Sequence, residues 1–434
     1  MKKIVSLIVI VGVLMSFGIA QGVQAKEKVE LEWWSPQAAQ PTQVAYYNYI
    51  IAQFEKKYPY VEIEKLDMID EDFKISLRST MAAGIPPDVW FSWGGGILKS
   101  YVDAGCVVDL TELLNEPWAV EVIPRAPIAQ RTFYGRAYAV PTHLWAGHFF
   151  INTDLFDESG IEVPTEPWTW DEFKEAIETF KANGVIPITL GGKEKWELSF
   201  YYMYLVDRVG GSEIFTKALN RKPGYSFEDP VFVEAGKRTQ ELVELGAFQK
   251  GFLGAGYSEG ERLFSVSEAA MYLIGSWMVS ALRASYPEFP LDIIKFPTVP
   301  GGKGDPTMLL GGVQGSWAIS EASKCKKEAK ELFRLLYTPE NIIKFAQDTG
   351  EPIVFSVELP PGTYDPAIEK QLKDAAKASW LQFAYDQLCP PRLASVHLDN
   401  VAGLFAGTVT PEEMATAQEE CARELEKEGI LPFE

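Results

Sequence analysis

The chain has 434 residues, a hydrophobic fraction of 47% and a formal net charge of −20 at pH 7. This length exceeds what one hydrophobic core usually supports, so it predicts two domains that each bury an interior of their own. The acidic balance argues against nucleic acid or an anionic membrane surface as a partner, because both would repel the protein.

The first residues have the pattern of an export signal. Two lysines precede an apolar run from Ile4 to Ala20, and small residues then offer a cleavage site after Ala25. We therefore expect a secretory signal peptide over residues 1–25, rather than a retained membrane anchor, and a mature chain in the periplasm. No cysteine precedes Cys106, so the signal region lacks the thiol that a bacterial lipoprotein acylates, and we expect no lipid anchor.

Strands alternate with helices at the start of the mature chain. The expected elements are a strand over Leu31–Trp34, a helix ending at Tyr58, a strand from Val61, a helix over Asp70–Ala83 and a buried strand over Val89–Phe91. This alternation predicts an α/β fold with a parallel, doubly wound sheet, whose ligands gather at the carboxyl ends of the strands. Trp34 and Trp93 lie at two such ends.

The segment from Tyr134 to Phe173 predicts a passage between two lobes. A strand around Val140 should end at Pro141, which has no N–H for a sheet, and a new apolar run starts at Phe149. Between the two strands lie polar or aromatic side chains of His143, Trp145 and His148. A second passage is expected over Pro297–Pro306, which contains three prolines and three glycines.

Several helices carry sequence signals at their ends. Thr169 and Glu172 form a capping box, Trp168 can pack on Phe173, and the helix should end at Asn183-Gly184. Further helices are expected to begin at Asp229-Pro230, to cover Lys326–Tyr337, to run from Thr338-Pro339 to Gly350, to cover Asp365–Trp380 and Leu393–Phe405, and to begin at Thr410.

The chemistry-bearing residues do not form a recognisable catalytic or metal motif. Four cysteines allow three pairings, of which we consider only Cys389 with Cys421, and no Cys/His spacing suits zinc. We find no G-x-S-x-G, H-E-x-x-H or P-loop pattern, and no pair among 60 carboxylates can be assigned as a glycosidase dyad. We therefore expect no metal, no cofactor and no catalytic residue.

Eight short motifs occur in an order that resembles the family 1 extracellular solute-binding proteins of ABC importers, the class that contains maltodextrin-binding proteins. The motifs are F-E-K-K-Y-P (Phe54–Pro59), A-A-G-I-P-P-D-V (Ala82–Val89), D-A-G with D-L-T (Asp103–Thr111), Y-A-V-P (Tyr138–Pro141), I-N-T-D-L-F (Ile151–Phe156), W-T-W-D-E-F (Trp168–Phe173), A-A-M with G-S-W (Ala269–Trp277) and K-E-A-K-E-L-F (Lys327–Phe333). The resemblance covers nearly the whole mature chain.

The resemblance implies a two-lobe, type II periplasmic-binding-protein fold, in which each lobe has a mainly parallel sheet flanked by helices and a hinge joins the lobes. We expect the N-terminal lobe to comprise residues 26–141 and 299–338, and the C-terminal lobe residues 142–298 and 339–434. The third crossing should then fall near Thr338–Lys344. The implied function is capture of a sugar, most often an oligosaccharide, and its delivery to the ABC permease by a monomer without enzymatic activity.

Aromatic and polar side chains of the resembling motifs suggest where a sugar would bind, because the apolar face of a sugar stacks on aromatic rings while its hydroxyls need polar partners. The candidate ligand-binding residues are Trp34, Gln37, Trp93, His143, Trp145, Trp277, Trp317, Glu351 and Arg392. For each tryptophan the alternative is packing in the core. A secreted carbohydrate-active enzyme remains an alternative function, as does a binder of a glycerophosphodiester, which should show a basic cluster in the cleft.

Overall fold

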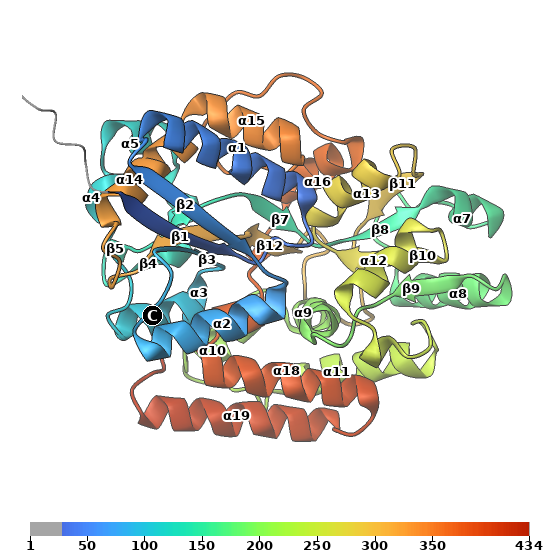
Figure 1. Cartoon of the computed structure of the whole chain (residues 1–434). Coiled ribbons are helices and arrows are strands. Elements are labelled where there is room, and N and C mark those ends of the chain that lie inside the picture. The colour runs from blue at the N-terminus through green and yellow to red at the C-terminus, as the bar shows by residue number, and fades with distance from the viewer. Residues whose placement is uncertain (1–27, 434) are drawn as a thin grey trace, which may run out of the picture.

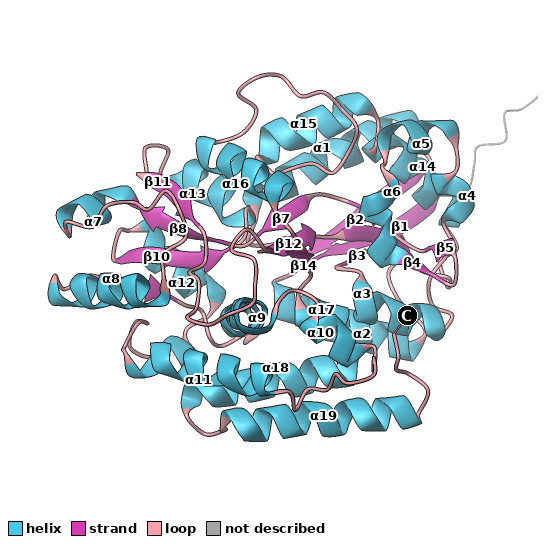
Figure 2. Ribbon diagram, turned by 180° about the vertical axis from the view of Figure 1, so that it is seen from behind, coloured by secondary structure: helices cyan, strands magenta, loops and turns pink. Residues whose placement is uncertain are grey.

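The computed structural model describes residues 28–433, so the expected signal peptide lies outside the described residues. The described chain forms two α/β lobes side by side, each with a hydrophobic core of its own (Figure 1). A smaller sheet connects the lobes. In the second view, α9, α11, α18 and α19 form a helical layer below the sheets (Figure 2).

The first lobe contains a five-stranded sheet in the order β2-β1-β3-β13-β6. Its elements are β1 (Val29–Ser35), α1 (Pro41–Lys57), β2 (Val61–Asp67), α2 (Asp70–Ala83), β3 (Val89–Ser92), α3 (Gly95–Asp103), α4 (Thr111–Leu114), α5 (Pro117–Val122), α6 (Arg125–Ile128), η1 (Ala129–Arg131), β4 (Thr132–Phe133), β5 (Arg136–Ala137), β6 (Val140–Pro141), β13 (Ser316–Ile319), α14 (Lys326–Leu336) and α15 (Pro339–Thr349).

The second lobe contains a four-stranded sheet in the order β11-β8-β10-β9. Its elements are β8 (His148–Asn152), α7 (Thr153–Glu158), α8 (Trp170–Ala182), β9 (Ile186–Thr189), α9 (Trp196–Gly210), α10 (Ile214–Leu219), α11 (Pro230–Glu244), η2 (Phe252–Gly254), α12 (Tyr257–Ser265), β10 (Ala269–Ile274), α13 (Trp277–Ser285), β11 (Leu291–Ile294), α16 (Pro366–Lys377), α17 (Tyr385–Leu388), α18 (Pro391–Ala406) and α19 (Pro411–Lys427).

The connecting sheet has the order β14-β12-β7 and consists of β7 (Leu144–Ala146), β12 (Leu309–Val313) and β14 (Leu381–Gln382). The large sheets are mixed rather than mainly parallel, which corrects the sequence expectation. β13 pairs antiparallel with β3, and β8 pairs antiparallel with both β10 and β11. The reason is that β8 and β13 each follow a crossing directly, so neither strand is preceded by the helix that a parallel connection requires.

Local signals at the helix ends are confirmed. The capping box of Thr169 and Glu172 is complete, and the rings of Trp168 and Phe173 lie 6.1 Å apart. Thr410 forms a second capping box with Glu413 at the start of α19. These bonds satisfy backbone N–H groups that have no partner inside the helix.

The lobe boundaries differ from the sequence expectation at two places. Arg208 on α9 donates to the Phe296 carbonyl before the predicted second crossing and to the Met308 carbonyl after it, so this segment belongs to the second lobe. The chain passes to the first lobe only after β12. On α15, Phe345 packs on Tyr46 with ring centroids 5.1 Å apart, so α15 belongs to the first lobe and not, as expected, to the second.

Three chain segments are hydrogen-bonded to one another where the lobes meet. Thr142 N–H donates to the Gly315 carbonyl (2.9 Å), and Gln314 N–H donates to the His143 carbonyl (2.8 Å). Leu144 N–H donates to the Pro352 carbonyl (2.7 Å). These backbone bonds bring residues 142–144, 314–315 and 351–353 together at the junction of the lobes, and such short connections between rigid bodies are typical of a hinge.

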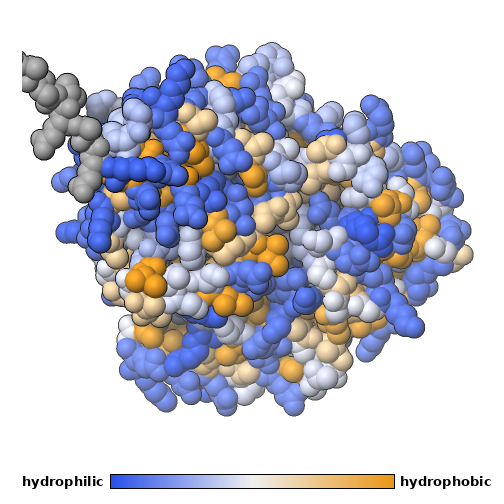
Figure 3. All heavy atoms as spheres, viewed as in Figure 1, coloured by the Kyte–Doolittle hydropathy of each residue, from blue (hydrophilic) through white to orange (hydrophobic). Residues whose placement is uncertain are grey.

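One face of the molecule shows how hydrophilic and hydrophobic residues are distributed on the surface. Figure 3 shows a face that is mostly hydrophilic, with hydrophobic residues in small separate patches. Between residues 28 and 433, none of the helices combines the length and apolar composition that crossing a membrane requires. All four cysteines are free, so the pairing of Cys389 with Cys421 is not formed.

Candidate ligand-binding site

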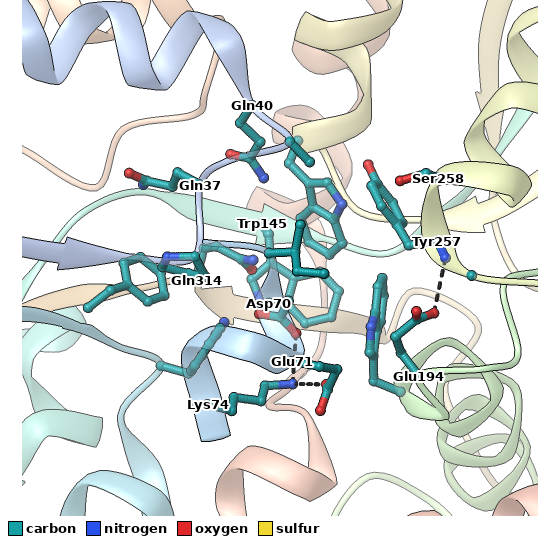
Figure 4. Close-up of a pocket in the computed structure, with 18 of the residues that line it drawn as sticks. Gln37, Gln40, Asp70, Glu71, Lys74, Trp145, Glu194, Tyr257, Ser258 and Gln314 are labelled. Carbon is teal, nitrogen blue, oxygen red and sulfur yellow. Dashed lines mark hydrogen bonds and ion pairs between the residues drawn. The ribbon is translucent and has the colours of Figure 1, made fainter. Parts of the chain in front are cut away.

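A cavity of about 610 Å³ lies between the two lobes. Its first-lobe side includes the loop before α1, the starts of α1 and α2, the end of β3 and Gln314. Its second-lobe side includes the starts of α9, α12 and α13 together with α17, and Trp145 of β7, on the connecting sheet between the lobes, packs with the rings of this side. Figure 4 shows side chains from both sides converging around Trp145. Ligand sites occur preferentially in such clefts between domains.

The second-lobe side of the cavity is a connected group of aromatic rings, which we call the aromatic wall and define as Trp145, Trp196, Phe200, Tyr257 and Trp277. Trp145 stacks on Phe200 at 5.2 Å and lies 5.5 Å from Trp277. Trp196 lies 6.0 Å from Trp277 and 5.9 Å from Tyr257. Since each ring is held by at least one other, the wall presents a stiff apolar surface.

The first-lobe side carries one tryptophan and several amides. Trp93 packs on Phe91 with centroids 5.0 Å apart, and the Lys74 ammonium lies 5.3 Å from the centre of its ring. The lining amides of this side are Gln37, Gln40, Gln43 and Gln314, and Gln387 on α17 adds a fifth from the second lobe. Each amide offers both donors and an acceptor, which suits a ligand rich in hydroxyl groups.

Two of these amides belong to a chain of hydrogen bonds that ends on a buried carboxyl. Gln37 Nε2 donates to Gln43 Oε1 (2.6 Å), and Gln43 Nε2 donates to Glu351 Oε1 (3.2 Å). Burial raises the pKa of Glu351 to about 8, against the lowering effect of the Gln43 bond. Burial also lowers the pKa of His143 to about 3, so its imidazole is neutral at pH 7.

The charged groups of the lining are mostly acidic. They are Asp70, Glu71, Glu194, Glu259 and Asp386 among the acids, and Lys74 and Arg262 among the bases. Lys74 Nζ lies 2.7 Å from carboxylates of both Asp70 and Glu71, and Arg262 is paired with Glu259 at 3.0 Å. Both lining cations are therefore already neutralised, and an anionic ligand would face an excess of negative charge.

The start of α12 adds polar groups opposite α2. Tyr257 N–H donates to the Glu194 carboxylate (3.1 Å), and Ser258 lies beside it in the lining (Figure 4). Asp386 on α17 lies near the start of α2. Burial raises the pKa of Asp386 to about 6, although the charge of Lys74 on α2 lowers it. The described residues contain no cluster of His, Cys, Asp and Glu side chains with the arrangement of a metal site.

Five of the nine candidate residues line this cavity and four do not. Gln37, Trp93, His143, Trp145 and Trp277 are in the lining. Trp317 is buried in the first core, 4.9 Å from Trp33, and Trp34 is half-buried on the opposite face of β1 from Trp33. Glu351 is buried behind the lining, and Arg392 on α18 is paired with Glu428 at 3.0 Å.

Five further residues line the cavity and were not among the sequence candidates: Gln40, Trp196, Phe200, Tyr257 and Gln314. A signal was available for Tyr257, since it follows Gly256 at the start of a helix, where backbone N–H groups have no partner within the helix and can bond to other groups. Trp196 also begins a helix, one residue after Lys195, which has a positive φ of 68°. Nothing local marks Gln40 or Gln314.

An interlobe cavity with stacked rings on one side and amides on the other defines a solute-binding protein of two lobes. Residues 38–343 match the family described as bacterial extracellular solute-binding protein. The match covers more than half of the 434 residues, and the chain belongs to this family.

The similar proteins include sugar-binding proteins. A multiple sugar-binding protein of Streptococcus mutans is 28% identical over 221 residues, which is 50% of this chain and 51% of that protein. This chain therefore spans about half the length of that relative. A probable sugar-binding periplasmic protein of Mesorhizobium japonicum is 22% identical over 92% of this chain and 94% of its own.

Two solved structures share the fold over nearly the whole chain. A chitin oligosaccharide binding protein has 26% identity and a TM-score of 0.84, covering 92% of this chain and 98% of its own. A protein from a study of xylan utilisation by the thermophilic bacterium Caldanaerobius polysaccharolyticus has 30% identity and a TM-score of 0.83. This match covers 90% of the present chain and 99% of that protein's chain. These likenesses agree with the two-lobe, type II fold expected from the sequence.

Proposed function

We propose that this protein is the extracytoplasmic solute-binding component of an ABC import system and that its ligand is an uncharged oligosaccharide. The observation that carries the proposal is the aromatic wall, which faces Trp93 and the lining amides across a cavity of about 610 Å³. Stacked rings suit the apolar faces of successive sugar units, and the amides suit their hydroxyls. The similar proteins are named for sugars, xylan utilisation and chitin oligosaccharides, which supports the same ligand class.

The lining charges favour an uncharged ligand over a glycerophosphodiester. A phosphate group needs free cations or backbone N–H groups, whereas Lys74 and Arg262 are engaged by carboxylates. Placing a phosphodiester beside five lining acids would add repulsion. The basic cluster that this alternative requires is absent from the described lining residues.

The remaining parts of the proposal concern transport. The protein is exported by its N-terminal segment, acts in the periplasm as a monomer without a lipid anchor, and delivers its ligand to the permease subunits. Ligand release is not accompanied by chemical change, so the protein is a carrier and not a carbohydrate-active enzyme. The family and the similar proteins consist of binding proteins, which supports this choice.

A thermal-shift screen over mono- and oligosaccharides tests the proposal, because a ligand that binds only the folded protein raises the melting temperature by mass action. We expect oligosaccharides to give the largest shifts, with affinity then measured by calorimetry. The bound sugar should be recovered unchanged by chromatography after prolonged incubation. A panel without any shift would overturn the proposed ligand class, and new products would favour the enzyme.

A further inference from the structure

Glu351 lies behind the cavity wall, where the two lobes meet. It follows Gly350, which ends α15, and only 1% of its surface is exposed. Its Oε1 accepts a hydrogen bond from Gln43 Nε2 on α1, and its Oε2 lies 3.8 Å from His143 Nε2. The carboxyl is therefore hydrogen-bonded to α1 and lies against the segment that connects β6 with β7.

The groups around Glu351 lead to the cavity from both lobes. Gln43 and His143 both line the cavity. Gln43 also accepts a hydrogen bond from Gln37, which is a third lining residue. The Ser276 hydroxyl faces the carboxyl from the second lobe, directly before Trp277 of the aromatic wall. One buried group thus contacts side chains on the first lobe, on a crossing and on the second lobe.

The neighbours of Glu351 do not supply a positive charge. His143 is neutral at pH 7, and the tyrosines that face Glu351 are Tyr47 on α1, Tyr257 on α12 and Tyr364 before α16. Burial raises the pKa of each of these tyrosines, so they are neutral as well. The Arg131 guanidinium lowers the pKa of His143 further and is not among the groups that shift the pKa of Glu351.

A buried carboxylate without a cation is costly, whereas a neutral acid fits these partners. Oε2 has no hydrogen-bond partner among the described residues and lies 3.8 Å from the neutral Nε2 of His143. The Ser276 hydroxyl lowers the pKa of Glu351, but burial outweighs this effect. Oε1 of the neutral acid would still accept from Gln43. Ionisation would leave a negative oxygen facing an imidazole nitrogen, so His143 would have to change its tautomer or move.

We propose that Glu351 is a positioning residue that, as a neutral acid, holds Gln43 and His143 in the cavity wall without touching the ligand. This inference rests on the proposed function and replaces the expectation that Glu351 grips the ligand itself. Ligand binding should weaken at alkaline pH, because an ionised Glu351 would not hold the lining residues in place. Since burial raises the pKa of Glu351 to about 8, the change falls in an accessible range.

The test compares calorimetric affinities of the wild type, Glu351→Gln and Glu351→Leu for the best saccharide of the screen, from pH 6 to pH 9. If only the neutral form binds, the wild-type Kd rises about tenfold between pH 7 and pH 9. Glu351→Gln keeps a hydrogen-bond donor and an acceptor but has no acidic proton to lose. Its Kd should therefore equal that of the wild type at pH 7 and stay constant from pH 6 to pH 9. Glu351→Leu should bind weakly at every pH.

Glu197→Gln is the matched control. Glu197 is also fully buried, burial also raises its pKa to about 8, and it lies outside the cavity lining, bound by Tyr272 and by Gly191 N–H. This variant should keep the wild-type pH dependence. A wild-type affinity that does not change with pH, a tenfold change that persists in Glu351→Gln, or an unaltered affinity in Glu351→Leu would each overturn the inference.

A readout without ligand separates this inference from the proposed function. When the pKa of an acid is higher in the folded than in the unfolded protein, the acid contributes to the stability of the fold at any pH below its unfolded pKa. This contribution is lost as the pH rises from the unfolded pKa to the folded pKa. The melting temperature of the wild type should therefore fall more between pH 5 and pH 9 than that of Glu351→Gln. Parallel curves would show that Glu351 is ionised and overturn the inference, even if no saccharide binds.

Discussion

The second-lobe side of the cavity carries all five rings of the aromatic wall, whereas the first-lobe side carries one tryptophan, four of the five lining amides and the ion pairs of Lys74. The rings of the aromatic wall hold one another at 5.2 to 6.0 Å. The first-lobe groups are instead held by hydrogen bonds and ion pairs, as in Gln37 with Gln43 and Lys74 with Asp70. The difference indicates that the second lobe supplies most of the stacking area and the first lobe most of the amides that orient a ligand, while acids of both lobes select by charge.

Removing a ring from the aromatic wall should have the largest effect. Trp277→Ala deletes the ring that joins Trp145 to Trp196, and we expect it to cost about 2–4 kcal/mol of binding free energy, as for a central hot spot. Calorimetry with the best saccharide measures this, and the thermal transition should stay cooperative. Trp118→Ala is the control, because Trp118 stacks on Tyr337 and is not a lining residue; an unchanged affinity in Trp277→Ala would remove this ring from the site.

Removing the first-lobe ring should cost less. The Lys74 ammonium already lies over Trp93, so this ring has less free face for a ligand. We expect Trp93→Ala to weaken binding by about 1 kcal/mol, roughly fivefold, in the same calorimetric assay. A loss equal to that of Trp277→Ala would show that both lobes supply stacking equally.

The charge of the first-lobe side should affect the choice of ligand more than its affinity. Glu71→Gln removes one of the two carboxylates on Lys74, so a saccharide oxidised to its aldonic acid should bind about threefold more tightly to the variant than to the wild type. The neutral saccharide should show almost no change. The gain should shrink as salt is raised, and a gain that does not depend on salt would point to a cause other than charge.

Removing a candidate residue outside the cavity should have the smallest effect. Arg392 lies on α18 with its guanidinium paired to Glu428. We expect Arg392→Ala to bind the saccharide with the wild-type Kd at every ionic strength. A measurable loss of affinity would mean that α18 contributes to the site, and the comparison of the two sides would then have to include a third region.

The sequence by itself determined where several helices begin and end, and its motifs indicated the protein family. The capping boxes at Thr169 and Thr410 are present, and α2 spans Asp70–Ala83 as expected, with Gly84 in the left-handed conformation after it. These features depend on hydrogen bonds and backbone preferences within about four residues, so a single stretch of sequence contains all the information. The order of the eight motifs indicated the two-lobe fold through the resemblance to a known family.

Tertiary structure alone decided which rings face the cavity and where the chain changes lobes. Trp33 and Trp34 are neighbours of the same residue type, yet only the first is fully buried, and neither lines the cavity. Likewise, Arg208 attaches residues 297–308 to the second lobe through bonds that span about ninety positions. A tryptophan has the same sequence signature in a core and in a binding site, because packing against distant segments determines which of the two it becomes.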